Sequence, residues 1–141
     1  MTTDTPQLQI AFASSDGVTV DGHFGSCEQF YIYSLDADKQ QKIDVRQAES
    51  GQGVDKNALR AELIADCHLL FCASIGGPAA ARVIRSGIYP MKCKPVNDSF
   101  PDLADQLDQL QQRLKSGALP PWLGKIMGQT NNLNERFATS D

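Results

Sequence analysis

The stretch LLFCASIGGPAAARVIRSGIYP, residues 69–90, decides the fold class of this chain. It opens within an unbroken apolar run, His68 to Ala73, which is typical of a strand covered on both faces. Gly76-Gly77 follows, and an apolar-striped segment ending at Gly87 predicts a short helix. Tyr89 to Val96 then predicts a second strand. A strand-helix-strand unit requires parallel strands joined by a right-handed crossover.

Three further strands are predicted upstream of this unit. Leu8, Ile10 and Phe12 alternate with less apolar neighbours, which indicates a strand over 8–13 with one well-buried face. Aromatic and β-branched residues fill 30–35, and apolar residues alternate again over 43–47 after a polar turn. These spacings favour an antiparallel β-meander.

Two more helices complete the predicted order. Asp55 or Asn57 is placed to cap a short helix before the buried strand. Ser99 and Asp102 have capping-box spacing ahead of leucines that recur every three or four residues over 103–114. The sequence therefore predicts an α/β fold of order β-β-β-α-β-α-β-α, with a mixed five-stranded sheet and helices on its faces.

Composition narrows the function classes. The 141 residues suit one domain, and a net charge of −4 gives no basic footprint for nucleic acid. Without a signal peptide or an apolar run of about 20 residues, we expect a cytoplasmic protein that does not enter membranes. The four cysteines are then expected as free thiols or metal ligands rather than disulfides.

A turn-rich segment over 16–27 holds one of the two histidines. Gly22 and Gly25 bracket His23, so the backbone can bend sharply and a bulky ligand can approach the imidazole. Cys27 follows four residues later, and imidazole and thiolate both suit iron-sulfur chemistry. The alternative, which spacing alone favours, is a histidine bonded to its own turn and a cysteine that packs as a small hydrophobe.

The Gly76-Gly77 turn is the second candidate site. Glycines that open a helix expose free amides, which favour an anion. The alternative is a tight turn with no ligand, and the GxGxxG dinucleotide motif cannot be matched here.

Together, VDGHFGSCEQFYIY (20–33) and the 69–90 stretch resemble the dinitrogenase iron-molybdenum cofactor-binding family of the NifX, NifY, NafY and VnfX type. The Pro-Pro-Trp-Leu at 120–123 is similar to the NifY and NafY branch. The resemblance implies a ribonuclease H-like fold and a non-catalytic carrier of the iron-molybdenum cofactor, or of an iron-sulfur precursor. His23 matches the family's cofactor-binding histidine.

From the resemblance and the residues we predict a cofactor-binding site and a set of partners. The cargo would be bound by His23 as a cluster ligand, with Cys27 as a second candidate ligand and with Gly25, Gly76 and Gly77 close by. The partners implied are apo-dinitrogenase and other cofactor-assembly proteins, and the chain is expected to be a monomer. The expected parts are an extension at 1–7, the cofactor-binding domain at 8–116, and a Pro/Trp segment with a flexible tail at 117–141.

Two other functions are considered. The chain could stabilise apo-dinitrogenase as an interaction protein without touching cofactor. It could instead be a metal-dependent phosphoryl hydrolase, with Asp16, Asp21 and Asp66 around a divalent ion, although this rests on analogy with the fold class alone.

Overall fold

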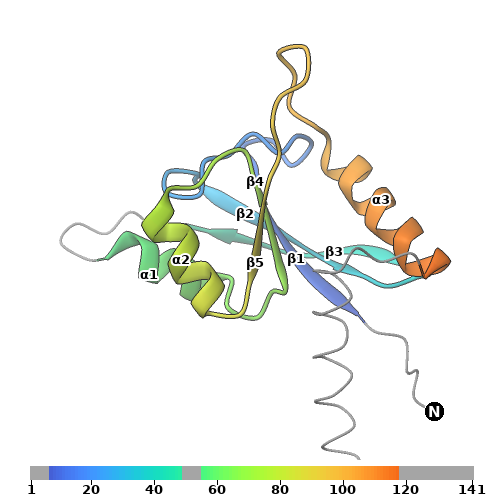
Figure 1. Cartoon of the computed structure of the whole chain (residues 1–141), viewed down its shortest axis with the longest axis horizontal. Helices are drawn as coiled ribbons and strands as arrows, with labels where there is room; N and C mark the ends of the chain where they lie inside the picture. The colour runs from blue at the N-terminus through green and yellow to red at the C-terminus, as the bar shows by residue number, and fades with distance from the viewer. Residues whose placement is uncertain (1–6, 49–54, 118–141) are drawn as a thin grey trace, which may run out of the picture.

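A computed structural model describes residues 7–48 and 55–117 of the chain. Within those ranges, five strands form one mixed sheet in the order β3-β2-β1-β4-β5, and three helices flank it (Figure 1). The elements are β1 (Leu8–Ala13), β2 (Gln29–Leu35), β3 (Gln40–Gln47), α1 (Lys56–Leu63), β4 (Leu69–Cys72), α2 (Gly77–Arg85), β5 (Tyr89–Lys92) and α3 (Leu103–Ser116). The predicted α/β class and element order are confirmed.

Strand β1 lies at the centre of the sheet, antiparallel to β2 and parallel to β4. Leu8, Ile10 and Phe12 point to one face, and Ala11 and Ala13 point to the other, all with no exposed surface. The prediction of a single buried face for this strand was therefore wrong. The alternation was real, but it separates large from small side chains because helices cover both faces.

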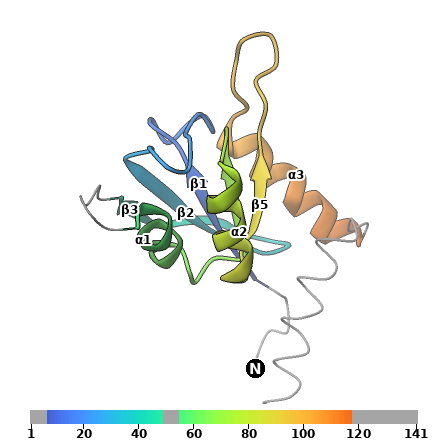
Figure 2. The ribbon, with the colours of Figure 1, turned by 60° about the vertical axis from the view of Figure 1, so that its left-hand side comes forward.

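The two faces of the sheet have separate cores. Helices α1 and α2 pack with Ala61, Ile64 and Val83 against the face that carries the alanines of β1. Helix α3 packs with Leu103 and Leu107 against the face that carries Leu8, Ile10 and Phe12. Figures 1 and 2 show α3 on one side of the sheet and the other two helices on the opposite side.

The helix starts were predicted with mixed success. Asp55 caps α1, and its side chain accepts hydrogen bonds from the amides of Asn57 and Ala58. At α3, the predicted capping role of Ser99 is wrong. Asp102 is the N-cap residue, and Ser99 instead exchanges two backbone hydrogen bonds with Val96 in a tight turn.

Strand β5 is shorter than predicted, because it ends at Lys92 rather than at Val96. Residues 93–101 leave the sheet as a hairpin that projects from the body of the protein in both views (Figures 1 and 2). Asn97 and Asp98 at its tip have φ angles of 53° and 63°. Two consecutive positive φ values are typical of a type I′ turn, which asparagine and aspartate tolerate.

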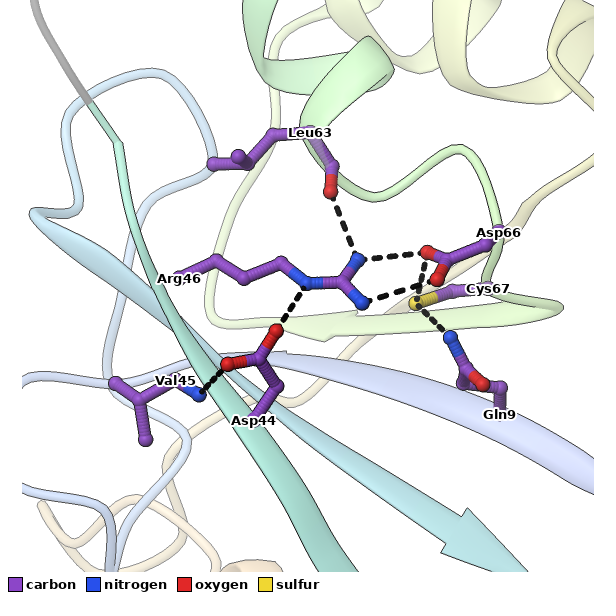
Figure 3. Close-up of polar contacts among 7 residues, drawn as sticks. All are labelled: Gln9, Asp44, Val45, Arg46, Leu63, Asp66 and Cys67. Carbon is purple, nitrogen blue, oxygen red and sulfur yellow. Dashed lines mark hydrogen bonds and ion pairs between the residues drawn. The ribbon is translucent and has the colours of Figure 1, made fainter.

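An ion-pair cluster joins β3 to the segment that precedes β4 (Figure 3). The guanidinium of Arg46 makes a bidentate ion pair with the Asp66 carboxylate, at 2.7 and 2.9 Å. It also donates to the Leu63 carbonyl at 2.9 Å. Its Nε donates to Asp44 at 2.9 Å. Asp66 precedes β4, whereas Arg46 lies opposite Phe30 of β2, so this cluster joins the edge strand to the α1–β4 connection.

Several predictions fall on segments that the structure does not describe. The Pro-Pro-Trp-Leu segment at 120–123 and the tail that follows lie outside the described residues, as do residues 1–6. The proposed division into an extension, a domain and a tail stays a prediction. None of the helices in the described ranges is long and apolar enough to cross a membrane.

Candidate functional site

Gly22 occupies the point where the strand order of the sheet reverses. Its amide donates to the Ala13 carbonyl at the end of β1 (3.0 Å), and its carbonyl accepts from the Ala73 amide just beyond β4 (2.8 Å). A Cβ at this glycine would lie 2.8 Å from the backbone of Ala13, so only glycine fits. Ligands of open α/β sheets commonly bind at this kind of position, outside the carboxyl ends of the strands.

The residues that follow Gly22 form a tight turn with distinct inner and outer sides. The amides of Ser26 and Cys27 both donate to the His23 carbonyl, at 3.1 and 2.8 Å. Phe24 and Cys27 point inward and are buried, and Phe24 packs against Phe30 with 5.7 Å between ring centroids. His23 is exposed on the outer side. The apolar anchors therefore fix the turn and leave the imidazole accessible.

The imidazole is held from one side only. Its Nδ1 lies 2.7 Å from the hydroxyl of Ser74, and the Phe24 amide donates to the Ser74 carbonyl at 2.9 Å. A Cβ on Gly25 would lie 3.3 Å from His23 Nε2, so the absence of a side chain there leaves Nε2 uncovered. A proton on Nδ1, donated to Ser74, would leave the Nε2 lone pair available to a metal atom.

The Gly76-Gly77 turn begins two residues after Ser74. Gly76 is the N-cap of α2 and provides no side-chain cap, and proline follows at position 78. A Cβ on Gly76 or Gly77 would meet no atom within 4 Å. Strand β4 therefore brings the glycine turn and the His23 turn to the same edge of the sheet, through Ser74, and both are open to an approaching ligand.

Cys27 lies beneath the turn rather than on its surface. Its side chain is 9% exposed, and its Sγ lies 3.4 Å from Nη1 of Arg60. Burial raises the pKa of the Cys27 thiol, and the charge of Arg60 opposes that shift. In this conformation Cys27 is a protonated, covered thiol, so its role as a second cluster ligand stays a prediction.

The other three cysteines are also buried and free. Burial raises the pKa of Cys67 and of Cys72 to about 12, and that of Cys93 to about 11. These thiols therefore have almost no thiolate character near neutral pH.

Sequence reasoning missed two residues of this site, Ser74 and Arg60. Ser74 follows a buried strand directly, which is a position where side chains often reach ligands. Arg60 is four residues before the buried Ile64, so it falls on the apolar stripe of α1. A charged residue on a stripe that packs against the core was the signal for it.

The carboxylates considered for a hydrolase do not converge. Asp16 accepts from the amides of Val18 and Thr19, both at 2.9 Å, which lowers the pKa of its carboxyl to about 2. Asp21 accepts from Ser15, and Asp66, just before β4, pairs with Arg46 of β3. In the part of the chain that the structure describes, no three His, Cys, Asp or Glu side chains are grouped to hold a metal ion.

Comparisons with known proteins agree on one family. The family model described as dinitrogenase iron-molybdenum cofactor matches residues 6–111. The chain is 45% identical over 122 residues to Protein NifY of Klebsiella pneumoniae, covering 86% of this chain and 51% of that protein. It is 39% identical over 134 residues to Protein NifY of Azotobacter vinelandii, covering 92% of this chain and 52% of that protein. The chain thus spans about half the length of these two relatives.

The fold is also found in a solved structure of low sequence similarity. The crystal structure of PH0822 superimposes with a TM-score of 0.59 at 16% identity, covering 74% of this chain and 91% of that one. At this identity the likeness concerns the fold alone.

Proposed function

The chain belongs to the dinitrogenase iron-molybdenum cofactor family, and from that premise we propose that it binds the iron-molybdenum cofactor, or an iron-sulfur precursor, as cargo during the maturation of dinitrogenase. Membership of the family supports a part in nitrogen fixation and cofactor maturation. The binding itself, and the residues that perform it, are our proposal.

The observation that carries the proposal is the presentation of His23. Its ring stands at the carboxyl edge of the parallel strands, with Nδ1 bonded to Ser74 and with Nε2 uncovered beside Gly25. A hydrogen bond to one ring nitrogen commonly orients a histidine whose other nitrogen binds a metal. We infer that Nε2 ligates a metal atom of the cluster, and that the amides opened by Gly76 and Gly77 face its anionic parts.

Such a site suits a carrier better than a resident cofactor. A pre-assembled cluster already has most of its bonds, so one imidazole and a few amides can hold it without enclosing it. Most of the cluster surface then stays free to engage the acceptor. We propose that binding is reversible and that the protein catalyses no reaction on its cargo. Apo-dinitrogenase and other cofactor-assembly proteins are the partners we propose, with the chain acting as a monomer.

Anaerobic titration with isolated iron-molybdenum cofactor tests the proposal directly. We expect saturable binding with one cofactor per chain, and release to apo-dinitrogenase when that acceptor is added. Elemental analysis of protein purified anaerobically from a nitrogen-fixing host would identify the metals that it carries. Saturation at one cofactor per chain with subsequent transfer supports the carrier, whereas turnover of any substrate contradicts it.

The same titration separates the carrier from an interaction protein. If the chain binds apo-dinitrogenase but takes up no cofactor, the interaction function replaces the carrier function. Binding of cofactor by the isolated chain, before any partner is added, would exclude that replacement.

A further inference from the structure

Arg60 is a buried cation, and no carboxylate of residues 7–48 or 55–117 pairs with it. Its side chain is 4% exposed, and among the residues that the structure describes no other charged side chain is buried. Nη1 donates to the carbonyls of Phe24 (3.0 Å) and Cys27 (2.7 Å) and to the Cys27 sulfur (3.4 Å). Its Nε is buried and has no partner within the described ranges.

Two ion-paired arginines, Arg46 and Arg82, differ from Arg60 in this respect. Arg46 and Arg82 each pair with a carboxylate at 2.7 Å and are partly exposed. The guanidinium of Arg60 carries a positive charge into the protein interior. Burying a cation costs free energy that neutral carbonyls only partly offset, and an uncharged amide such as glutamine could bond the same carbonyls. Hydrogen bonds to the two carbonyls therefore do not explain why this side chain is charged.

Arg60 lies on the inner side of the turn, opposite the side on which His23 is exposed. The carbonyls of Phe24 and Cys27 point inward to Nη1, while His23 is exposed on the outer side of the turn. A trans peptide directs its N–H opposite to its carbonyl. The Phe24 carbonyl that faces Arg60 therefore turns the Gly25 N–H outward, towards the side where Nε2 of His23 is uncovered.

Resting on the cargo function proposed above, we propose that Arg60 is the positioning residue of the cargo site. From beneath the turn, it holds the Phe24–Gly25 peptide with its N–H facing the cargo, and it places a fixed positive charge behind that peptide. The ligand that this arrangement recognises is an anionic iron-sulfur-type cluster bound at His23. Arg60 acts through the turn and does not touch the cargo.

Three variants test the role of the charge, with isolated iron-molybdenum cofactor as the probe under anaerobic conditions. Arg60→Met removes the charge and keeps the length of the stem, and Arg60→Lys keeps the charge. We expect the methionine variant to bind at least roughly tenfold more weakly and to lose much of its salt dependence, while the lysine variant stays within about threefold of the parent. Arg46→Met, on the edge strand β3, removes a charge that makes no contact with the His23 turn in the described residues. It is the matched control and should bind as the parent does.

A second measurement does not depend on the variants folding. In the parent protein labelled with 15N, unpaired electrons of the bound cluster should broaden the Gly25 amide and the Arg60 Nε resonance, and leave that of Arg46 sharp. Methionine and lysine variants that lose equal affinity would overturn the inference, and so would broadening that spares both Gly25 and Arg60. If the methionine variant binds as tightly as the parent, the Arg60 role fails and the carrier function stands. If the parent itself binds no cofactor, both fail.

Discussion

The Nδ1 of His23 and the hydroxyl oxygen of Ser74 are 2.7 Å apart, although 51 residues separate them in the sequence. Their backbones also form a parallel bridge, so the turn that follows β1 and the turn that follows β4 are joined twice. The hydrogen bond restricts rotation of the imidazole, and a proton on Nδ1 that is donated to Ser74 would leave Nε2 free. The orientation of the proposed ligand thus depends on a residue outside its own loop.

Ser74→Ala should loosen the imidazole without unfolding the protein. Ser74 is exposed, so we expect the free energy of unfolding to change by about 0.5 kcal/mol or less. Loss of the hydrogen bond should weaken cofactor binding by roughly threefold to tenfold, in line with a typical hydrogen bond. Ser74→Thr keeps the hydroxyl and serves as the control. Equal affinities for the alanine variant and the parent would show that the bond does not orient the ligand.

His23→Ala should separate binding from stability. The side chain is exposed and its loss opens no core cavity, so the unfolding free energy should change by only about 0.5 kcal/mol. We expect cofactor affinity to fall at least roughly tenfold, about 1.4 kcal/mol. Anaerobic titration and urea denaturation of the same sample measure the two effects.

His68→Ala provides the opposite pattern. Nδ1 of His68 accepts a hydrogen bond from the backbone N–H of Gln9 at 3.0 Å. Burial lowers the pKa of the His68 imidazole, which favours its neutral form. Truncation leaves that amide unpaired and should cost about 1–3 kcal/mol of stability, while cofactor affinity stays at the parent level. If His68→Ala loses affinity and His23→Ala does not, the wrong histidine has been assigned.

Gly25→Val should block the cargo without straining the backbone. The φ angle of Gly25 is not in the left-handed region, and a Cβ there would meet no atom but those of the His23 ring within 4 Å. A valine should therefore cover Nε2 and weaken cofactor binding by roughly tenfold or more, with an unfolding free energy within about 0.5 kcal/mol of the parent. Gly76→Ala, at an open position, should have a smaller effect. Parental affinity in Gly25→Val would mean that the cluster does not approach Nε2.

Alkylation of the native protein should be slow at every cysteine and fastest at Cys27. All four thiols are buried, but Cys27 is the one that contacts a cation, since Arg60 lies 3.4 Å from its sulfur. Bound cofactor should protect Cys27, because its turn carries the proposed ligand. Mass spectrometry of timed iodoacetamide reactions measures each rate. Faster labelling of Cys72 or Cys93 would contradict the prediction that Cys27 is the candidate ligand among the cysteines.

The Arg46–Asp66 pair should make the free energy of unfolding depend on pH in the acid range. The hydrogen bonds from Arg46 lower the pKa of the Asp66 carboxyl from 3.8 to about 2. Because the folded-state pKa is the lower one, the stabilisation is present above pH 3.8 and is lost as the pH falls from 3.8 through about 2. Asp66 is more than half exposed, so a double-mutant cycle with Arg46→Met and Asp66→Asn should give at most about 1 kcal/mol at pH 7. Denaturant midpoints of the four proteins at pH 7 and at pH 3 measure this coupling energy. An equal coupling energy at both pH values would show that the pair does not cause the pH dependence.

The fold class and the turn that holds His23 could both be predicted from the amino-acid sequence. Apolar periods of two and of about 3.6 identified the strands and helices, since local patterning records which faces are buried. Glycines on both sides of His23 marked the exposed turn. The boundaries were less secure, and β5 ended four residues early because the type I′ turn at Asn97 and Asp98 pulls residues 93–101 out of the sheet.

The neighbours of His23 could not be predicted from the sequence and are known from the folded chain. Ser74, just beyond β4, is 51 positions from His23 in the sequence. Arg60, on α1, is 37 positions from it. No local pattern encodes such contacts, because they arise where separate elements pack against one sheet. Burial likewise turned Cys27 from an apparently accessible loop thiol into a covered one. Desolvation depends on every neighbour that excludes water, and these neighbours are brought together only when the chain folds.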